Sequence, residues 1–173
     1  MVRPPLILFL LMLGSLCRAA PLGPGAAELD QGFFCALKTV SSEPAQDTVS
    51  GSINLVAGAP AFIGPGPEVP ARIGIGFGVM VRAAPGMAGP TTVQVEHPPM
   101  GPNAVTRQSW TTVLSGTQAQ YLGYTFELPY ELLPGRWTMS ARANGRAIYE
   151  VSFNVVNPAQ MPWITCGEQV PLS

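Results

Sequence analysis

The stretch Leu132–Val156, LLPGRWTMSARANGRAIYEVSFNVV, decides the fold that we expect for this chain. Apolar and polar side chains alternate in both halves of the stretch, and the apolar set comprises Trp137, Met139, Ala141, Tyr149, Val151, Phe153 and Val155. Alternation with a period of two is typical of strands that bury one face. An Asn-Gly pair at residues 144–145 separates the two halves and is a strong signal for a tight turn. The stretch therefore predicts a β-hairpin with one apolar face.

The turn determines the register of this hairpin. A two-residue Asn-Gly loop would place the polar Glu150 opposite Met139. A three-residue loop that includes the preceding alanine would place Tyr149 opposite Met139 and Val151 opposite Trp137. Because a slip of one residue moves a whole face from the core to water, we expect the three-residue loop.

Further strand patterns occur at short spacing along the chain, and no segment has the pattern of an amphipathic helix. The runs are Gly32–Thr39, Ser52–Val56, Ala61–Ile63, Arg72–Arg82, Thr91–His97, Val105–Leu114 and Tyr121–Leu128. Loops are expected at 40–50 and at 63–70, where Pro and Gly are frequent. The pattern predicts an all-β chain that folds as an antiparallel β-sandwich of seven or eight strands over residues 32–157.

One predicted strand carries glycines on alternate positions. In Arg72–Arg82 the apolar face begins at Ile73, and Gly74, Gly76 and Gly78 occupy the opposite face. Since glycine weakens a strand, we expect a neighbouring segment to approach this face closely. The pattern leaves open whether that segment is a second sheet or a partner.

Composition restricts the classes of protein that fit. The chain has 173 residues, of which 47% are hydrophobic and 11% charged, with a net charge of −1. This length fits one domain, and the apolar fraction is that of a folded protein. Because the sequence contains no basic cluster, we do not expect nucleic acid as a partner.

The N-terminus has the pattern of a secretory signal. Arg3 precedes an unbroken apolar run, and small residues follow, which predicts a signal peptide of residues 1–19 with cleavage after Ala19. A lipid anchor on Cys17 is the alternative, although Leu16 before it does not fit that signal. We expect a periplasmic or secreted protein that does not insert into the membrane after cleavage, with a linker at 20–31.

Cleavage leaves two cysteines, Cys35 and Cys166. In an exported chain such a pair predicts a disulfide, which here would tie the C-terminal tail, residues 158–173, to the first strand. A reactive thiol pair is the alternative, but the cysteines lack the C-x-x-C spacing. Met161 and Trp163 also suggest that the tail docks.

Residues that could perform chemistry are few. A hydrolase would need His97, the single histidine, beside Asp30 or Asp47. Acid–base chemistry by a pair of carboxylates could use Glu127 and Glu131, but they flank Pro129 at the end of a strand and are predicted to be solvated. We therefore expect a protein that is not an enzyme and that has no cofactor.

The segment HPPMGP, His97–Pro102, is the candidate interaction loop. Its prolines would order a contact surface at low entropic cost, and the candidate residues are His97, Pro98, Pro99, Met100 and the aromatic Trp110. The alternative is that the prolines only end a strand and protect a sheet edge. A different hypothesis is a periplasmic copper protein, in which His97 and Met100 would supply imidazole and thioether ligands. Other aromatic candidates for an interface are Tyr121, Tyr124 and Tyr130.

Two resemblances add to these expectations. The run at 132–137, L-x-P-G-x-aromatic, resembles the corner before the penultimate strand of immunoglobulin and fibronectin type III domains, with Trp137 in place of the usual tyrosine. Several segments together also resemble an uncharacterised family of small exported proteobacterial domains, a family of domains of unknown function; they are Phe34–Ala36, Val69–Val79, Glu96–Met100, Trp110–Thr112, Pro129–Met139 and the pair Cys166-Gly167. This family implies an immunoglobulin-like fold in the periplasm and supplies no catalytic residues. The expected role is therefore binding of an envelope protein or ligand, or structural support, at the cell envelope.

Overall fold

The computed structural model describes residues 23–166. The predicted signal peptide, residues 1–19, lies outside this range. Within it the elements are β1 Ala26–Cys35, β2 Thr39–Pro44, β3 Ser52–Val56, β4 Glu68–Pro70, β5 Ile75–Ala83, β6 Gly89–Met100, β7 Val105–Leu114, β8 Gln120–Thr125, the 3-10 helix η1 Pro129–Glu131, β9 Gly135–Ala143, β10 Arg146–Val156 and the 3-10 helix η2 Pro158–Gln160.

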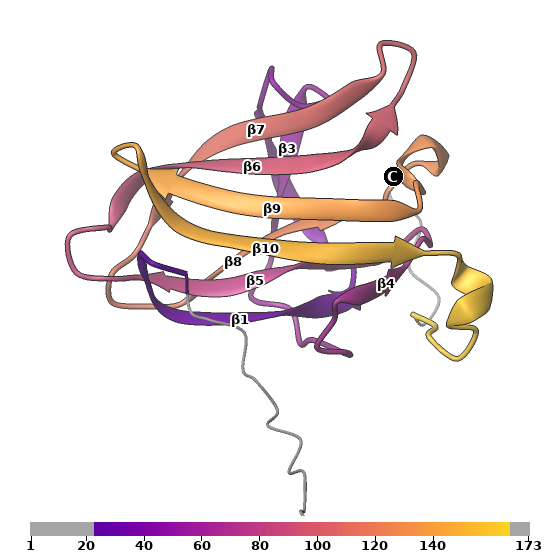
Figure 1. Ribbon diagram of the computed structural model, residues 1–173, viewed down its shortest axis with the longest axis horizontal. Coiled ribbons are helices and arrows are strands. Elements are labelled where there is room, and N and C mark those ends of the chain that lie inside the picture. The colour runs from indigo at the N-terminus through magenta and orange to yellow at the C-terminus, as the bar shows by residue number, and fades with distance from the viewer. Residues whose placement is uncertain (1–22, 167–173) are drawn as a thin grey trace, which may run out of the picture.

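Two sheets pack face to face, as Figure 1 shows. In the described part of the chain, a five-stranded sheet has the order β4-β10-β9-β6-β7 and a three-stranded sheet has the order β1-β5-β8. A separate two-stranded ribbon consists of β2 and β3. The protein is an all-β immunoglobulin-like sandwich, as predicted, with eight strands in the two described sheets.

Three predictions about the weaker strands were wrong. Residues 40–44, predicted as loop, belong to strand β2 of the ribbon. β4 lies in the segment predicted to be irregular and pairs parallel with the end of β10, through Val69 opposite Val155. β4 is an edge strand, where prolines are tolerated. Ala61–Ile63 forms no strand, and next to it Gly64 makes an isolated bridge with Phe33.

β1 begins earlier than predicted. The expected linker, residues 20–31, overlaps the strand from Ala26 onward, where Leu29 pairs with Val81 and Gln31 with Val79 of β5. The first half of β1 places charged and polar side chains at solvent-facing positions, so it lacks the apolar alternation that identified other strands. Pairing with the buried strand β5 fixes it instead.

The β9–β10 hairpin has the predicted apolar face but not the predicted register. Met139 lies opposite Val151, and Trp137 lies opposite Phe153. The turn is the two-residue loop, since Asn144 and Gly145 have φ of 51° and 73°, as a type I′ turn requires. A bulge after Ala147 then restores the apolar face. A tight turn and a bulge together replace the expected three-residue loop.

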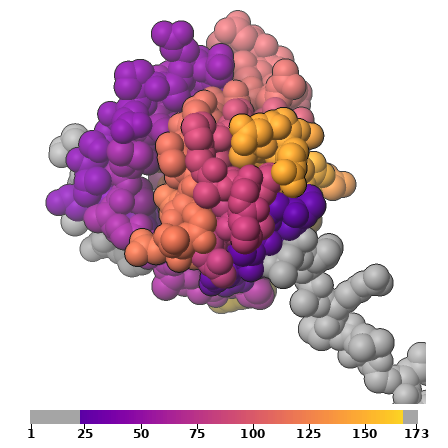
Figure 2. All heavy atoms as spheres, turned by 90° about the vertical axis from the view of Figure 1, so that its left-hand side faces the viewer, coloured from indigo at the N-terminus to yellow at the C-terminus, as the bar shows by residue number. Residues whose placement is uncertain are grey.

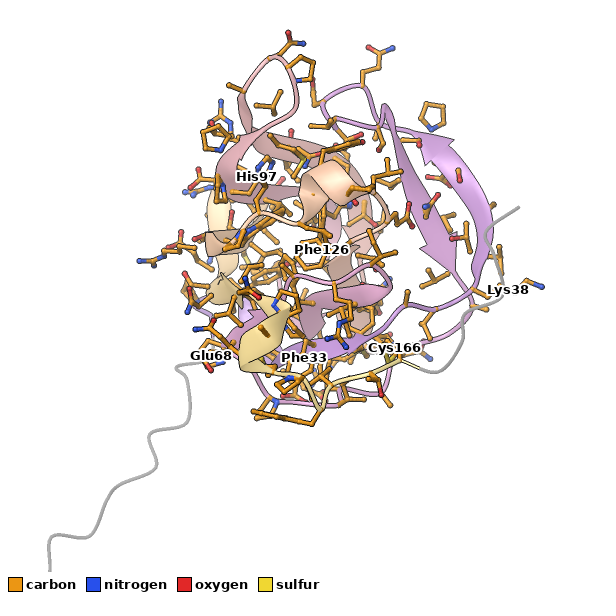
Figure 3. All side chains as sticks on the ribbon, turned by 90° about the vertical axis from the view of Figure 1, so that its right-hand side faces the viewer. Phe33, Lys38, Glu68, His97, Phe126 and Cys166 are labelled. Atoms are coloured by element: carbon orange, nitrogen blue, oxygen red, sulfur yellow. A yellow bond between two sulfur atoms is a disulfide. The ribbon has the colours of Figure 1, made fainter. Side chains whose placement is uncertain are left out.

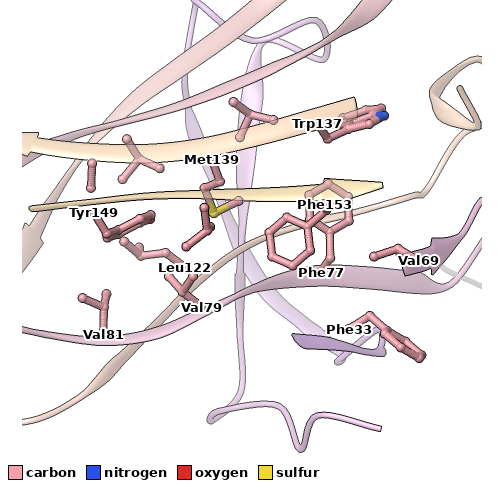
Figure 4. Close-up of a cluster of buried hydrophobic side chains, with 14 of the residues drawn as sticks. Phe33, Val69, Phe77, Val79, Val81, Leu122, Trp137, Met139, Tyr149 and Phe153 are labelled. Carbon is pink, nitrogen blue, oxygen red and sulfur yellow. The ribbon is translucent and has the colours of Figure 1, made fainter. Parts of the chain in front are cut away.

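The core lies between the two sheets (Figure 4). Trp137 is fully buried, and its indole Nε1–H donates a hydrogen bond to the Leu133 carbonyl oxygen at 3.0 Å. Its ring packs edge-on against Phe77 and Phe126, at centroid distances of 5.6 Å each. The prediction that the hairpin's apolar face forms the core is confirmed.

The glycines of β5 allow close approach from within the molecule. A Cβ atom on Gly76 would lie 2.4 Å from the Phe34 ring, and one on Gly78 would lie 2.3 Å from the Leu122 carbonyl oxygen of β8. Elements of the same sheet therefore occupy this space. The predicted apolar face wrongly included Ile73, which is exposed. β5 begins only after Gly74, which has a left-handed φ of 81° and forms part of the preceding turn.

A disulfide joins Cys35, the last residue of β1, to Cys166, with 5.4 Å between the Cα atoms. This confirms the predicted pairing. The tail that it holds also packs through Met161 and Ile164 against the core, whereas Trp163 is 72% exposed. The docking predicted for Met161 thus occurs, and the docking predicted for Trp163 does not.

Candidate functional site

The candidate site originates from the unequal width of the two sheets. On β7, Gln108 lies opposite Val95 and Trp110 opposite Val93. Because Val93 and Val95 are fully buried, Gln108 and Trp110 lie on the inner face of the five-stranded sheet. The described three-stranded sheet ends at β8. It therefore has no further strand opposite this part of β7.

A groove of about 690 Å³ occupies this position, between β7, β8 and the β2–β3 ribbon. Figure 2 shows a hollow between the indigo-to-purple ribbon and the orange surface of β8. The lining mixes polar side chains with aliphatic and aromatic ones, and the apolar contributors include Leu37, Val40, Ile53, Leu55, Val56, Trp110, Tyr121, Leu122 and Tyr124. Aromatic and aliphatic side chains beside convergent polar groups are typical of ligand-binding grooves.

Polar contacts hold the ribbon beside the sandwich. The Ser109 amide donates to the Asp47 carbonyl oxygen at 3.0 Å, and the Val49 amide donates to Gln108 Oε1 at 2.7 Å. From the ribbon, Asn54 Nδ2 donates to the Glu127 carboxylate at 2.8 Å. These contacts lie on β7 and just after β8, so they fix both walls of the groove.

His97 belongs to this polar network and not to an exposed loop. Its Nε2 atom lies 3.0 Å from Gln108 Nε2, and its Nδ1 atom lies 2.8 Å from the Pro98 carbonyl oxygen. Because Oε1 of Gln108 already accepts from Val49, its amide group donates to His97 Nε2, and Nδ1–H donates to Pro98. The imidazole is therefore neutral, and burial lowers its pKa, an effect that the hydrogen bond to Pro98 partly offsets.

The structure corrects the predicted interaction loop at His97 and Met100. β6 extends through Met100, and the side chains of His97 and Met100 are buried, the first against the Trp137 ring at 4.8 Å. Pro98 is half-buried and Pro99 is exposed. The apolar alternation of β6 continues into His97, so the core holds His97 and Met100, whereas Pro99 and the following Gly101 and Pro102 are exposed. Figure 3 shows His97 at the side of the molecule away from Lys38 and the ribbon.

Of the five predicted interaction residues, Trp110 alone lines the described groove. Tyr121 and Tyr124, also predicted as interface aromatics, lie there as well. The sequence pattern did not identify the ribbon residues or Gln108 as parts of a binding site. A signal for Gln108 exists in its position opposite Val95, but this is visible only once the register of β6 and β7 is known.

Glu131, predicted to be solvated, is buried beside the groove. Its carboxylate accepts hydrogen bonds from the Tyr124 hydroxyl at 2.9 Å and from the amides of Glu127 and Leu128 at 2.6 and 2.7 Å. Burial raises the pKa of Glu131, and the hydrogen bonds oppose that effect. The short helix η1 folds the side chain back onto the end of β8, and this fold-back has no signal in the local sequence pattern.

Neither the copper hypothesis nor the hydrolase hypothesis finds a prepared site in this geometry. Both ring nitrogens of His97 are engaged by protein groups, and Met100 is buried with its sulfur 3.9 Å from the Tyr124 hydroxyl. Across residues 23–166 no group of three or more His, Cys, Asp or Glu side chains could hold a metal ion. Within the same range, the described partners of His97 include no aspartate.

The fold is thus an immunoglobulin-like β-sandwich, and the groove opens at one side of it. Residues 24–155 match a family described as a domain of unknown function, DUF3859, and the chain belongs to this family. No curated protein shows significant sequence similarity to this chain. An immunoglobulin-like protein from Pseudomonas aeruginosa is similar in structure, with a TM-score of 0.48 and 19% identity over 78% of this chain and 96% of that chain. In the described range no helix is long and apolar enough to cross a membrane.

Proposed function

We propose that this protein is exported and acts as a non-catalytic binding module at the cell envelope, with the groove as its binding site. The observation that carries the proposal is the groove itself, whose walls present Trp110, Tyr121 and Leu55 beside the packed core of the sandwich. Aromatic side chains in a half-open cleft are favourable anchors for a ligand.

Export is supported by two independent features. The first 19 residues have the pattern of a signal peptide, and the Cys35–Cys166 disulfide is typical of oxidising compartments. Cell fractionation of the native host tests this part of the proposal. We expect the mature chain in the periplasm or medium with its N-terminus at Ala20, and a full-length chain in the cytoplasm would contradict export.

Site-specific photocrosslinking tests the binding role. A photoreactive residue replaces Leu55 in the groove in one variant and Arg142, exposed on the outer face of β9, in a matched control. We expect a defined crosslinked product from position 55 that excess unlabelled protein suppresses, and no such product from position 142. Identical products from both positions, or none from position 55, would contradict the groove as the binding site.

A further inference from the structure

Within residues 23–166, the edge of β8 that faces the groove has backbone groups without a pairing strand. Phe126, just after β8, donates its N–H to the Ile75 carbonyl oxygen of β5, and its own carbonyl accepts from Gly74. Backbone groups of an antiparallel strand point alternately to its two sides. Tyr121, Gly123 and Thr125 therefore direct their N–H and C=O groups away from β5.

No strand pairs with this side of β8 within the described residues. The three residues that point there, Tyr121, Gly123 and Thr125, all line the groove. The opposite wall differs. On the free edge of β7, the Ser109 N–H is bonded to Asp47, and the Val113 carbonyl accepts from the Gln120 side chain at 3.3 Å. Among residues 23–166, the backbone groups on this side of β8 are therefore free in a continuous run, whereas those on the edge of β7 are interrupted.

An added strand is the partner that such an edge fits. Exposed strand edges are templates for pairing, and an extended peptide supplies N–H and C=O groups at the matching spacing. A strand beside β8 would become the fourth strand of the narrower sheet, opposite β7. Side chains on one of its faces would then reach the inner face of β7 at Trp110.

The charge of the groove restricts the peptide further. The charged residues that line it are Glu127 and Glu131, and both are acidic. No arginine, lysine or histidine lines the described groove. A neutral or basic peptide is therefore favoured over an acidic one.

We propose that the groove binds an extended segment of a partner protein, apolar on alternate residues and neutral or basic, by addition of that segment as a strand to the free edge of β8. This inference rests on the proposed function and specifies the class of ligand. Strand addition at the β8 edge can therefore fail while the groove still binds another kind of ligand, which the photocrosslinking experiment would detect.

A displayed library of random ten-residue peptides, selected on the oxidised mature protein, provides the probe. We expect selected peptides to alternate apolar and polar residues and to contain Lys or Arg more often than Asp or Glu. In amide hydrogen exchange, such peptides should protect Tyr121, Gly123 and Thr125. A library without binders, or protection confined to other segments, would overturn strand addition, while the crosslinking result would still decide the groove's role.

Two variants at one position sharpen the test. Thr125→Pro removes an outward N–H and is expected to weaken peptide affinity about tenfold or more. Thr125→Val removes the hydroxyl but keeps the N–H, so its affinity should fall clearly less than that of Thr125→Pro. Equal affinities of the two variants would contradict backbone pairing. Should Thr125→Pro fail to fold, the exchange protection in the unaltered protein decides the question alone.

Discussion

Tyr149 has a hydroxyl group that the core leaves without a partner. The side chain is fully buried, and its oxygen makes no hydrogen bond in the described structure. Burial raises the pKa of this phenol. A buried polar group without a partner destabilises the fold.

Tyr149→Phe should therefore stabilise the protein by about 1 kcal/mol, measured as an increase in the denaturant midpoint. Tyr124→Phe is the matched control. It removes a hydrogen bond to the buried Glu131 carboxylate and should destabilise by about 1–2 kcal/mol. A clear loss of stability in Tyr149→Phe would mean that the hydroxyl has a partner.

His97 makes stability depend on pH. Because burial lowers its pKa in the folded state from the ordinary 6.5, the unfolded chain binds this proton more readily. Stability should therefore fall as the pH decreases below about 6.5 toward the folded-state pKa. Glu131, whose pKa is raised, acts with the opposite sign near and above its ordinary 4.5.

Denaturant midpoints measured from pH 7.5 to 5.5 test this prediction. The slope with pH should be smaller in His97→Gln than in the parent, because the variant lacks the titrating group. Equal slopes in the two proteins would show that His97 does not titrate with a lowered pKa.

At the scale of elements, the pairing of β5 with β8 depends on Gly78. A Cβ atom there would lie 2.3 Å from the Leu122 carbonyl oxygen and 2.6 Å from Gly123 Cα, both backbone atoms. Gly78→Ala should therefore shift β8 and destabilise by about 1–3 kcal/mol. Gly116→Ala is the control, since its Cβ would meet the Ala88 side chain at 3.3 Å, and its effect should be small. Equal thermal midpoints would contradict the close approach of the two strands.

The strands with clear alternation were predictable from the sequence, and the others were not. β3 and β7 have the predicted bounds, and the hairpin has the predicted core face. β4 is short and proline-rich, so pairing with β10 alone determines it. The hairpin register was wrong because local pattern cannot distinguish a longer loop from a tight turn followed by a bulge.

The candidate site was less predictable than the fold. Trp110 was identified as a candidate, but the HPPMGP segment was preferred because its prolines suggested an exposed loop. The groove depends on how many strands each sheet contains and on where the ribbon docks. Both are long-range properties of the fold, which the alternation of neighbouring residues does not encode.

At the scale of the whole molecule, the disulfide joins the end of the first strand to the C-terminal tail. Cys35 and Cys166 are 131 residues apart in sequence. In the chain-entropy treatment a loop of this length stabilises the folded state by roughly 4–5 kcal/mol. The double variant Cys35→Ser with Cys166→Ser should lose a comparable amount, measured by denaturant unfolding. A parent protein that has two free thiols before reduction would contradict the bond.

The central claim is that β8 has a free edge that opens into the groove, and amide hydrogen exchange of the unliganded protein tests it most directly. Tyr121, Gly123 and Thr125 should exchange roughly a hundredfold or more faster than Leu122 and Tyr124, whose N–H groups bond to β5. That alternation along one strand is the result that the account predicts. Uniform protection of all five amides would show that the edge is already paired and would contradict the account.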